Sequence, residues 1–419
     1  MTGDADRAVA ITGIGLVTSL GPDRASTWEA LRRGRTGAAW LRRDDLGPGV
    51  AGFPVARPAS GADPALALLD RAVDGAIADA GLDAHGGLDP DRVAVLLGLS
   101  KGGVRSLARV HERVRSGEAA PDRDRDLARD WARSWPSSGA AAVSARLGSR
   151  GPCVAPVAAC ATGLVAVLQA VDLIRRGACD LALAGGADAS LEPIVLAAFR
   201  RMKVLARVEG DPVRAVRPWD RGRSGFLVGE GGAVLVLERL AAARARGATA
   251  YAEVAGGSIG SDAYHETALD PNPAGLARLI RRALADAGMR PADLDAANVH
   301  GTATRTNDPL ECRALRLALG ADADRLACSA NKAQIGHLLG AAGSVELAIA
   351  ALTVRDGFVP PTLNLDDPDP ACDLDATPHA GRPAPIRAVL KLSIGFGGHL
   401  AAAILRRVDA ARSHPMAPR

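Results

Sequence analysis

The chain repeats part of its own pattern. The sequence Ala-Asp-Ala-Gly at residues 78–81 closes one Ala-rich helical stretch and leads into the apolar run 93–97. The same four residues at 285–288 close another such stretch and lead into the apolar run 296–299. In both copies glycine stands where the end of a helix favours a left-handed residue. This repetition predicts a chain built from two related units.

A second correspondence supports the duplication. The small-residue segment 160–163 begins an apolar helix that ends near residue 177, and the segment 340–343 begins another that ends near residue 357. A chain of 419 residues is also longer than one ordinary core supports. We therefore expect an N-terminal half at residues 1–245 and a C-terminal half at 246–410. For residues 411–419 we expect a flexible tail, because they carry Pro and no apolar period.

Short apolar runs alternate with Ala-rich helical stretches along the chain. The runs lie at residues 9–17, 93–97, 181–184, 233–237, 296–299 and 388–394. This alternation is typical of α/β proteins, in which helices cover the faces of a sheet. Hydrophobic residues make up 48% of the chain but aromatic residues only 3%. The core is thus expected to consist of Ala, Val and Leu packed with many Gly.

Composition also excludes several classes of function. Lys and Arg number 51 against 47 Asp and Glu, and both signs are spread along the chain, so no nucleic-acid-binding stripe is predicted. No apolar run reaches the 18 or so residues of a membrane span. The six cysteines form no CxxC pair, and no signal peptide is recognisable. We expect a cytoplasmic protein without membrane insertion and without a metal site.

Cys160 is the candidate nucleophile. It follows an expected strand at residues 154–158 and precedes an expected helix that begins near Ala161. A thiol at the positive end of a helix macrodipole is predicted to favour the reactive thiolate. The alternative is a buried cysteine that acts as a small hydrophobic residue. We expect that role for the other five: Cys153, Cys179, Cys312, Cys328 and Cys372.

Polar residues follow the apolar run 296–299. They begin with His300, Thr302 and Thr304 and continue with Asp308 and Glu311. A histidine at the end of a strand, with Gly beside it, can project into a cleft while its backbone stays close to a ligand.

Two further segments complete the set. Lys332, His337 and Glu346 lie around the glycines of residues 336–343, and a buried Lys332 would need Glu346 as its partner. The glycine-rich turn 393–398 contains Phe396 and could aim backbone N–H groups at an anion. No Lys-Ser or Lys-Thr pair follows this turn, so it is a poor nucleotide loop.

Together, in this order, these segments resemble β-ketoacyl-acyl-carrier-protein synthases, the elongating FabF-like branch of the thiolase superfamily. The resemblance extends over residues 7–407. It implies an α/β thiolase fold whose two halves pack as a five-layered αβαβα core. It also implies an acyltransferase that carries out decarboxylative Claisen condensation, in fatty-acid or, as we expect here, in specialised polyketide biosynthesis.

The resemblance assigns a role to each residue. Cys160 would hold the acyl chain, and His300 and His337 would stabilise the enolate formed when malonyl-carrier protein loses CO2. The backbone N–H groups of Cys160 and Phe396 would form the oxyanion hole. Lys332 completes the catalytic set, where with Glu346 it would orient His337 and tune the local charge. Asp308 and Glu311 would be further supporting residues, and Thr302 and Thr304 would contact the pantetheine arm.

The implied partners follow from the same resemblance. No cofactor would be bound, because substrates arrive on the 4'-phosphopantetheine of an acyl carrier protein. Carrier proteins are generally acidic, and Arg200, Arg201 and Lys203 form a candidate docking patch. Family members are usually dimers, so we expect a homodimer or a heterodimer with a chain-length partner.

Three positions depart from the family pattern. Lys101 stands where an apolar residue usually faces the acyl pocket, Ile394 stands where Phe is common, and His399 begins a pair that is commonly Thr-Asn. With Phe396 they form the predicted acyl pocket or gate. We therefore expect a specialised acyl chain, of polyketide or polyunsaturated type, rather than routine fatty-acid synthesis.

Three alternatives remain open at this point. A non-elongating chain-length partner usually lacks the nucleophile, whereas this chain keeps Cys160, His300 and His337. A degradative thiolase generally pairs one His with a second Cys near the C-terminus, where this chain has the segment 393–396. A pure docking module for carrier proteins would bind them without acylation of Cys160.

Overall fold

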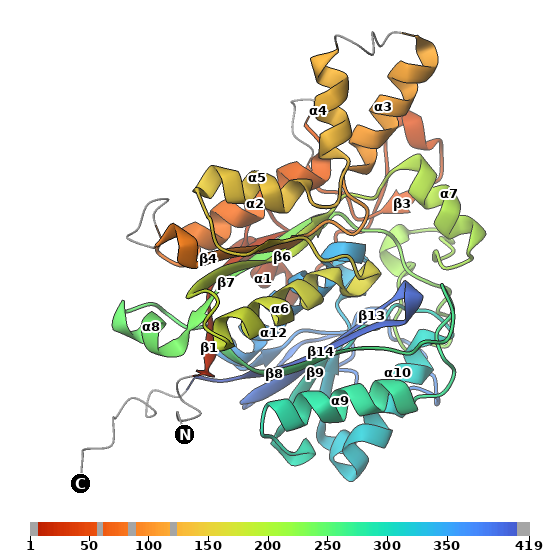
Figure 1. Cartoon of the computed structure of the whole chain (residues 1–419). Coiled ribbons are helices and arrows are strands. Elements are labelled where there is room, and N and C mark those ends of the chain that lie inside the picture. Colours follow the sequence, from red (N-terminus) through yellow and green to blue (C-terminus); the bar gives the residue numbers. More distant parts are fainter. Residues whose placement is uncertain (1–6, 57–61, 83–88, 118–123, 409–419) are drawn as a thin grey trace.

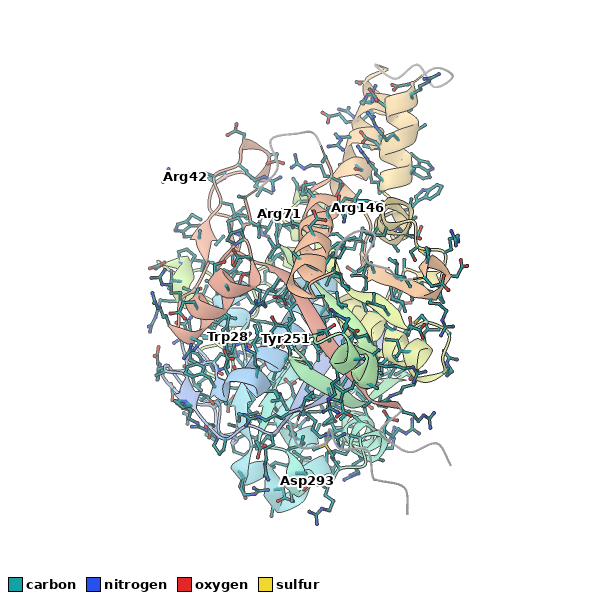
Figure 2. All side chains as sticks on the ribbon, turned by 90° about the vertical axis from the view of Figure 1, so that its left-hand side faces the viewer. Trp28, Arg42, Arg71, Arg146, Tyr251 and Asp293 are labelled. Atoms are coloured by element: carbon teal, nitrogen blue, oxygen red, sulfur yellow. The ribbon has the colours of Figure 1, made fainter. Side chains whose placement is uncertain are left out.

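The structure is a computed structural model, and it describes residues 7–56, 62–82, 89–117 and 124–408. The tail predicted at 411–419 lies outside these residues. Among the described residues, no helix is both long enough and apolar enough to cross a bilayer. Figure 2 shows side chains with nitrogen and oxygen atoms over the whole visible surface, with Arg71 and Arg146 in its upper part and Asp293 at its lower end.

A large mixed sheet organises the molecule, and each half of the chain contributes five strands to it. The N-terminal set is β1 (Val9–Val17), β4 (Val93–Gly98), β5 (Cys153–Val154), β6 (Leu181–Asp188) and β7 (Gly231–Arg239). The C-terminal set is β8 (Ala252–Ser261), β9 (Ala296–Asn298), β10 (Ala327–Ser329), β13 (Ala388–Gly395) and β14 (His399–Arg406).

The two sets have the same topology. The strand order is β5-β4-β6-β7-β1 in the first and β10-β9-β13-β14-β8 in the second, so each strand has a counterpart. The directions agree as well: β4 is parallel to both β5 and β6, as β9 is to β10 and β13, and the remaining neighbours are antiparallel. A short antiparallel pairing of β1 with β8 joins the sets. The prediction of two related halves is confirmed.

Helices cover both faces of each set of strands (Figure 1). Helices α2 (Pro64–Asp79) and α5 (Ser138–Leu147) pack on the outer face of the first set. Helices α9 (Ala274–Asp286) and α10 (Asn307–Leu319) cover the second set from the opposite side, α9 directly and α10 through α9. Between the sets lie α6 (Thr162–Arg175) and α12 (Ala342–Asp356), which contact each other. These are the five layers that the resemblance implied.

The other elements are shorter or lie at the periphery. The helices are α1 (Arg24–Arg32), α3 (Val104–Ser116), α4 (Arg125–Arg133), α7 (Pro193–Arg201), α8 (Leu240–Ala245) and α11 (Lys332–Ile335). Two small strand pairs join β2 (Ala39–Trp40) to β3 (Ala51–Gly52) and β11 (Phe358–Val359) to β12 (Arg382–Pro383). In Figure 1, α3 and α4 project from the body of the protein.

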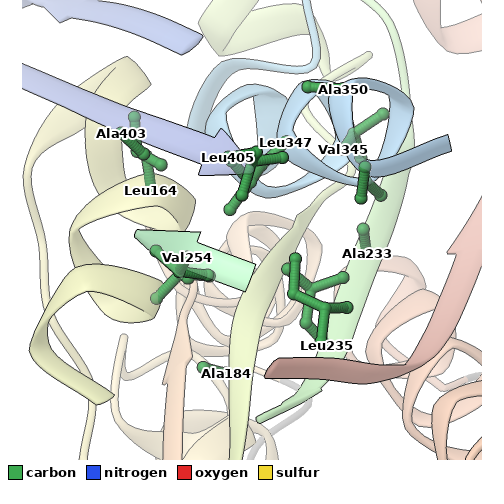
Figure 3. Packing of buried hydrophobic residues seen from close by; sticks show 14 of the residues in the cluster. Leu164, Ala184, Ala233, Leu235, Val254, Val345, Leu347, Ala350, Ala403 and Leu405 are labelled. Atoms are coloured by element: carbon green, nitrogen blue, oxygen red, sulfur yellow. The ribbon is translucent and has the colours of Figure 1, made fainter. Parts of the chain in front are cut away.

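The core of the central layer consists of small and branched aliphatic residues. Figure 3 shows Leu164 of α6 and Val345 of α12 with side chains from β6, β7, β8 and β14, among them Ala184, Leu235, Val254 and Leu405. Glycines let the two helices approach closely where they begin. A Cβ on Gly163 would lie 2.8 Å from the Ser344 nitrogen, and one on Gly343 would lie 2.6 Å from the Leu164 nitrogen. Each glycine thus makes room for the other helix's backbone.

Two predictions about the segment before Cys160 were wrong. The strand expected at residues 154–158 is limited to β5, at Cys153–Val154, because the chain turns away from the sheet edge toward the active-site turn. Cys153 was expected to be buried but is exposed, because β5 is the last strand of the sheet and nothing among the described residues pairs with its outer side.

Candidate active site

Cys160 lies in a tight turn at the start of α6. The turn spans Ala159–Ala161, and Ala159 has a φ of +45°, a conformation that L-residues rarely adopt. The side chain of Thr162 holds the turn, because its hydroxyl donates to the Ala159 carbonyl and accepts from the Ala158 N–H. Such strain at a reactive residue is typical of functional sites.

The thiol is buried rather than activated in advance. Burial raises the pKa of Cys160 to about 11, although the positive charges of Lys101 and Lys332 and a backbone hydrogen bond from Phe396 act in the opposite direction. The expected lowering of this pKa by the helix macrodipole is therefore wrong, because desolvation of the thiolate dominates. The thiol of the free site is protonated at neutral pH.

Phe396 follows β13 and brings a backbone N–H to the nucleophile. The approach depends on Gly395, where a Cβ would lie 2.8 Å from the Ala158 carbonyl oxygen and 3.1 Å from the Cys160 nitrogen. Because Gly395 lacks that atom, the end of β13 packs directly on the active-site turn. The N–H groups of Cys160 and Phe396 thus come from adjacent segments, as an oxyanion hole requires.

His300 follows β9, and its ring is fixed by Lys332. The ammonium of Lys332 donates to the His300 carbonyl and lies 3.5 Å from His300 Nδ1. Because an ammonium can only donate, Nδ1 is the acceptor and the proton resides on Nε2.

His337 follows α11 and has the same tautomer by a different route. The N–H of Leu339 donates to His337 Nδ1 at 3.3 Å, so Nε2 again carries the proton. The ring stands nearly perpendicular to that of Phe226, with centroids 4.7 Å apart, and its centroid lies 5.4 Å from that of His300. The two imidazole rings therefore lie next to each other.

Both histidines are neutral at physiological pH. Burial, followed by the charge of Lys332, holds the pKa of His300 well below its usual range, and the same two causes act on His337. A neutral imidazole keeps one N–H donor without adding a buried charge. Such donors suit an oxygen that becomes negative during a reaction.

One buried acid, Glu311, supports the His300 loop, and a second, Asp308, holds the neighbouring segment at Trp219. Glu311 accepts the backbone N–H groups of His300 and Gly301 at 2.5 and 2.9 Å. Burial raises the pKa of Glu311 to about 7. Asp308 accepts the N–H of Trp219 at 3.0 Å, and burial raises the pKa of Asp308 as well.

The predicted Lys332–Glu346 pair is present, and it includes a third residue. Glu346 binds Lys332 Nζ through Oε1 at 2.5 Å and Lys391 Nζ through Oε2 at 2.6 Å. Lys391 was missed because it lies within an apolar strand. Lys332 was expected to orient His337, but its hydrogen bonds run to His300, because α11 begins beside the end of β9.

A cavity of about 990 Å³ brings these groups together. Cys160, His300 and His337 all line it, with Ile394 and Phe396 from the C-terminal loop. The hydroxyls of Thr302 and Thr304 lie 3.0 Å apart in its wall. Elements of both halves therefore build one site.

Comparison with known proteins agrees with this geometry. The family model described as "Beta-ketoacyl synthase, N-terminal domain" matches residues 51–243, and the model of the C-terminal domain matches 251–366. The tetracenomycin polyketide synthase ketoacyl synthase alpha subunit of Streptomyces glaucescens is 39% identical over 99% of this chain and 100% of its own. The chain belongs to the β-ketoacyl synthase family.

Further relatives of this ketosynthase span two kinds of biosynthesis. The 3-oxoacyl-[acyl-carrier-protein] synthase 2 of Coxiella burnetii is 36% identical over 96% of this chain and 99% of its own. Among solved structures, a type II polyketide synthase acyl carrier protein in complex with its ketosynthase bound to the hexaketide matches with a TM-score of 0.90. That match has 30% identity and covers 96% of this chain and 100% of the other. The chain is therefore an acyltransferase-type condensing enzyme with the thiolase fold.

Two residues predicted at the acyl gate of this ketosynthase lie elsewhere. Lys101 is not among the described residues that line the cavity, because its ammonium binds Asp188 at 2.8 Å. His399 is exposed at the start of β14 and is likewise absent from the described lining. Ile394 and Phe396 remain at the wall.

The predicted basic patch is also redistributed. Arg200 and Lys203 line the cavity and are exposed, whereas Arg201 is exposed but does not line it. Arg207 and Arg305 join the cavity lining from other segments. No Asp or Glu of the described chain lines this cavity, so its open side is basic.

Proposed function

We propose that Cys160 accepts an acyl chain from a carrier protein and that His300 and His337 drive decarboxylation of the malonyl unit that extends it. In the first step the Cys160 sulfur attacks the incoming thioester, its proton passes to the carrier's sulfur, and the carrier's thiol leaves. In the second step the C–C bond to the malonyl carboxylate breaks, CO2 leaves, and the electron pair forms an enolate. The enolate carbon attacks the acyl carbonyl, the C–S bond to Cys160 breaks, and the departing thiolate takes up one proton from solvent.

The observation that carries this proposal is the matching tautomer of the two histidines. In each ring Nδ1 accepts a hydrogen bond, from Lys332 in one case and from Leu339 in the other. Each Nε2 is then free to donate to the malonyl thioester oxygen as it becomes an enolate. Both rings line the same cavity as Cys160.

We further propose that the N–H groups of Cys160 and Phe396 stabilise the tetrahedral oxyanion formed when the enolate attacks the acyl carbonyl on Cys160. Loss of one such donor typically costs on the order of 100-fold in rate. The high pKa of the buried Cys160 thiol suits the nucleophile of such a site, because the site then holds no uncompensated thiolate between turnovers.

An acyl carrier protein is the proposed source of both substrates, as named for the polyketide structure compared above. The exposed cations Arg200, Lys203, Arg207 and Arg305 line the open side of the cavity and suit an acidic carrier. Thr302 and Thr304 are the proposed hydrogen-bond partners of the phosphopantetheine arm. Both line the cavity, and in the sequence they lie between His300 and Arg305, which line it as well. No other cofactor is proposed.

A second subunit is proposed to cover the open edge of the sheet. Strand β5 ends the strand order, and Val154 on it is 41% exposed. On the projecting α4 and just after it, Trp131 and Trp135 are about half exposed and stack edge to face. An apolar strand edge of this kind invites pairing with another chain. A second copy and a chain-length partner both fit.

The substrate class proposed is a specialised polyketide-type chain, in line with the 39% identical polyketide synthase subunit. The cytoplasmic location and the division of the chain at residue 245 stay predictions.

The proposal is tested by separating the two half-reactions. Acyl transfer to the enzyme is measured from the intact mass of the protein, and CO2 release is measured with malonyl-carrier protein as the substrate. His337→Ala should keep the first and lose most of the second, because His337 acts on the malonyl unit. Arg282→Ala is the control, since Arg282 is exposed on α9 and is not among the residues that line the cavity. Equal CO2 release by His337→Ala and the wild type would contradict the proposal.

A further inference from the structure

The C-terminal half contains a counterpart of the nucleophile turn. Gly340 occupies in Leu339–Ala341 the place that Cys160 occupies in Ala159–Ala161, and each turn leads directly into a central helix. The backbone strain is the same, since Leu339 has a φ of +46° and Ala159 one of +45°. The second turn carries no nucleophile, yet the fold keeps its strained form.

A buried carboxylate holds this second turn. Asp188, the last residue of β6, accepts the N–H of Gly340 at 3.1 Å, and it is almost completely buried. Its counterpart at the end of β13 is Gly395, which packs against the nucleophile turn. The two halves therefore support their turns from equivalent strand ends, one with a bare glycine and the other with a charged side chain.

Lys101 compensates the charge of Asp188. Its ammonium lies 2.8 Å from Asp188 Oδ2, and Ser100 Oγ lies 3.1 Å from the same oxygen. Ser190 donates to the other oxygen, Oδ1. A buried carboxylate is stable only when it is paired and hydrogen-bonded in this way. Lys101, at a position where the sequence resemblance implied an apolar residue, thus serves as the counter-ion of Asp188.

The turn held by Asp188 is also the turn that orients His337. Leu339 donates to His337 Nδ1, and the next N–H along the chain, that of Gly340, donates to Asp188. Two consecutive amides thus point to two different acceptors. Loss of the Asp188 acceptor would free the strained turn to relax, and the Leu339 N–H would leave the imidazole.

We infer that Asp188 is a positioning residue for His337, acting through the backbone of Leu339 and Gly340, and that Lys101 is its counter-ion. The inference rests on the proposed function, because it assumes that His337 acts on the malonyl unit. It concerns decarboxylation and not the acylation of Cys160.

Paired substitutions that keep the site neutral test this role. Lys101→Met/Asp188→Asn removes both charges but keeps an oxygen acceptor for the Gly340 N–H. Lys101→Met/Asp188→Leu has a similar size and lacks that acceptor. Because both variants lose the same two charges, they differ in the acceptor oxygen at residue 188, which serves the Gly340 N–H and the hydroxyls of Ser100 and Ser190.

The expected result is a split between the half-reactions. Compared with the asparagine variant, the leucine variant should release CO2 from malonyl-carrier protein more slowly by on the order of tenfold to a hundredfold, with the same KM and the same rate of Cys160 acylation. The asparagine variant should release CO2 at close to the wild-type rate. Should the leucine variant not fold, Lys101→Met/Asp188→Ala removes the same acceptor and has the same expected result.

The control pair is Arg92→Met/Asp180→Asn. Arg92 and Asp180 form a 2.8 Å ion pair just before β4 and β6, at the opposite ends of the strands that lead to Lys101 and Asp188. This variant should leave both half-reactions unchanged.

Three results would overturn the inference: wild-type CO2 release by the leucine variant, an equal loss in the asparagine variant, or an equal loss of acylation and CO2 release. A wild-type enzyme that neither acylates Cys160 nor releases CO2 would instead contradict the proposed function, and this is seen before any variant is compared.

Discussion

Lys391 Nζ lies 2.6 Å from Glu346 Oε2, and neither side chain reaches solvent. With Lys332 on the other oxygen, Glu346 links strand β13, which carries Lys391, to the loop that carries His300. A carboxylate shared by two cations fixes both of them without filling the active-site cavity. The chain has only four lysines among its 51 basic residues, and three of them, Lys101, Lys332 and Lys391, lie in this region.

Lys391→Met should lower the free energy of unfolding by about 3 kcal/mol, because it leaves one oxygen of a buried carboxylate without its charged partner. Urea denaturation measures the change. Lys203→Met, which alters the exposed lysine, is the matched control and should change stability little. Equal midpoints for the two variants would show that the buried pair contributes nothing.

Gly343→Ala should destabilise the protein by about 2 kcal/mol, because the added Cβ would lie 2.6 Å from the Leu164 nitrogen, a backbone atom that cannot move aside. Thermal denaturation compares it with Gly275→Ala in α9, where the nearest atom is 3.8 Å away and belongs to the side chain of Arg278. Gly275→Ala should leave stability unchanged or raise it. The reverse order of the two variants would contradict the packing described for α6 and α12.

Glu311→Gln should slow CO2 release from malonyl-carrier protein by roughly tenfold, because an amide can accept only one of the two N–H groups that Glu311 now holds. Acylation of Cys160 should continue at the wild-type rate. Glu209→Gln, which changes an exposed acid, is the control. A parallel loss of acylation would mean that Glu311 supports the whole site rather than the His300 loop.

Alkylation of Cys160 by iodoacetamide should accelerate about tenfold per pH unit between pH 7 and 9, because its thiolate fraction rises toward the pKa of about 11. The histidines add no step in this range, since burial keeps both of their pKa values well below 6.5. The measurement uses a Cys153→Ser background, which removes the exposed thiol. A plateau already reached at pH 8 would indicate a preformed thiolate instead.

Much of the fold could be predicted from the sequence because the duplication is visible at helix ends. Gly81 and Gly288 both adopt left-handed conformations, with φ of +63° and +62°, and β1 begins and ends where the apolar run does. Strands β8 and β14 were not predicted. The first is rich in Gly and the second in Ala, and neither residue type favours strands, so only the pairing of β8 with β14 and β1 determines their structure.

The sequence pointed to Cys160, His300 and His337 because each is a reactive side chain within or beside a segment of small residues at the end of an expected element. The structure brings all three to one cavity. The contacts of Lys101 were not predictable, because its partner Asp188 is 87 residues away along the chain. Lys391 could have been singled out from the sequence, because it is a lysine within the apolar run 388–394 of a chain whose basic residues are nearly all arginine. The pKa of Cys160 was not predictable either, because it depends on how deeply the thiol is buried, and its position at the start of a helix does not determine that.

The most direct test of the account is the mass of the enzyme after incubation with an acyl carrier protein that bears a polyketide-type chain. The wild type and Cys153→Ala should each gain one acyl group, and Cys160→Ala should gain none and form no condensation product. Acylation and condensation by Cys160→Ala would contradict the central claim that this cysteine carries the growing chain.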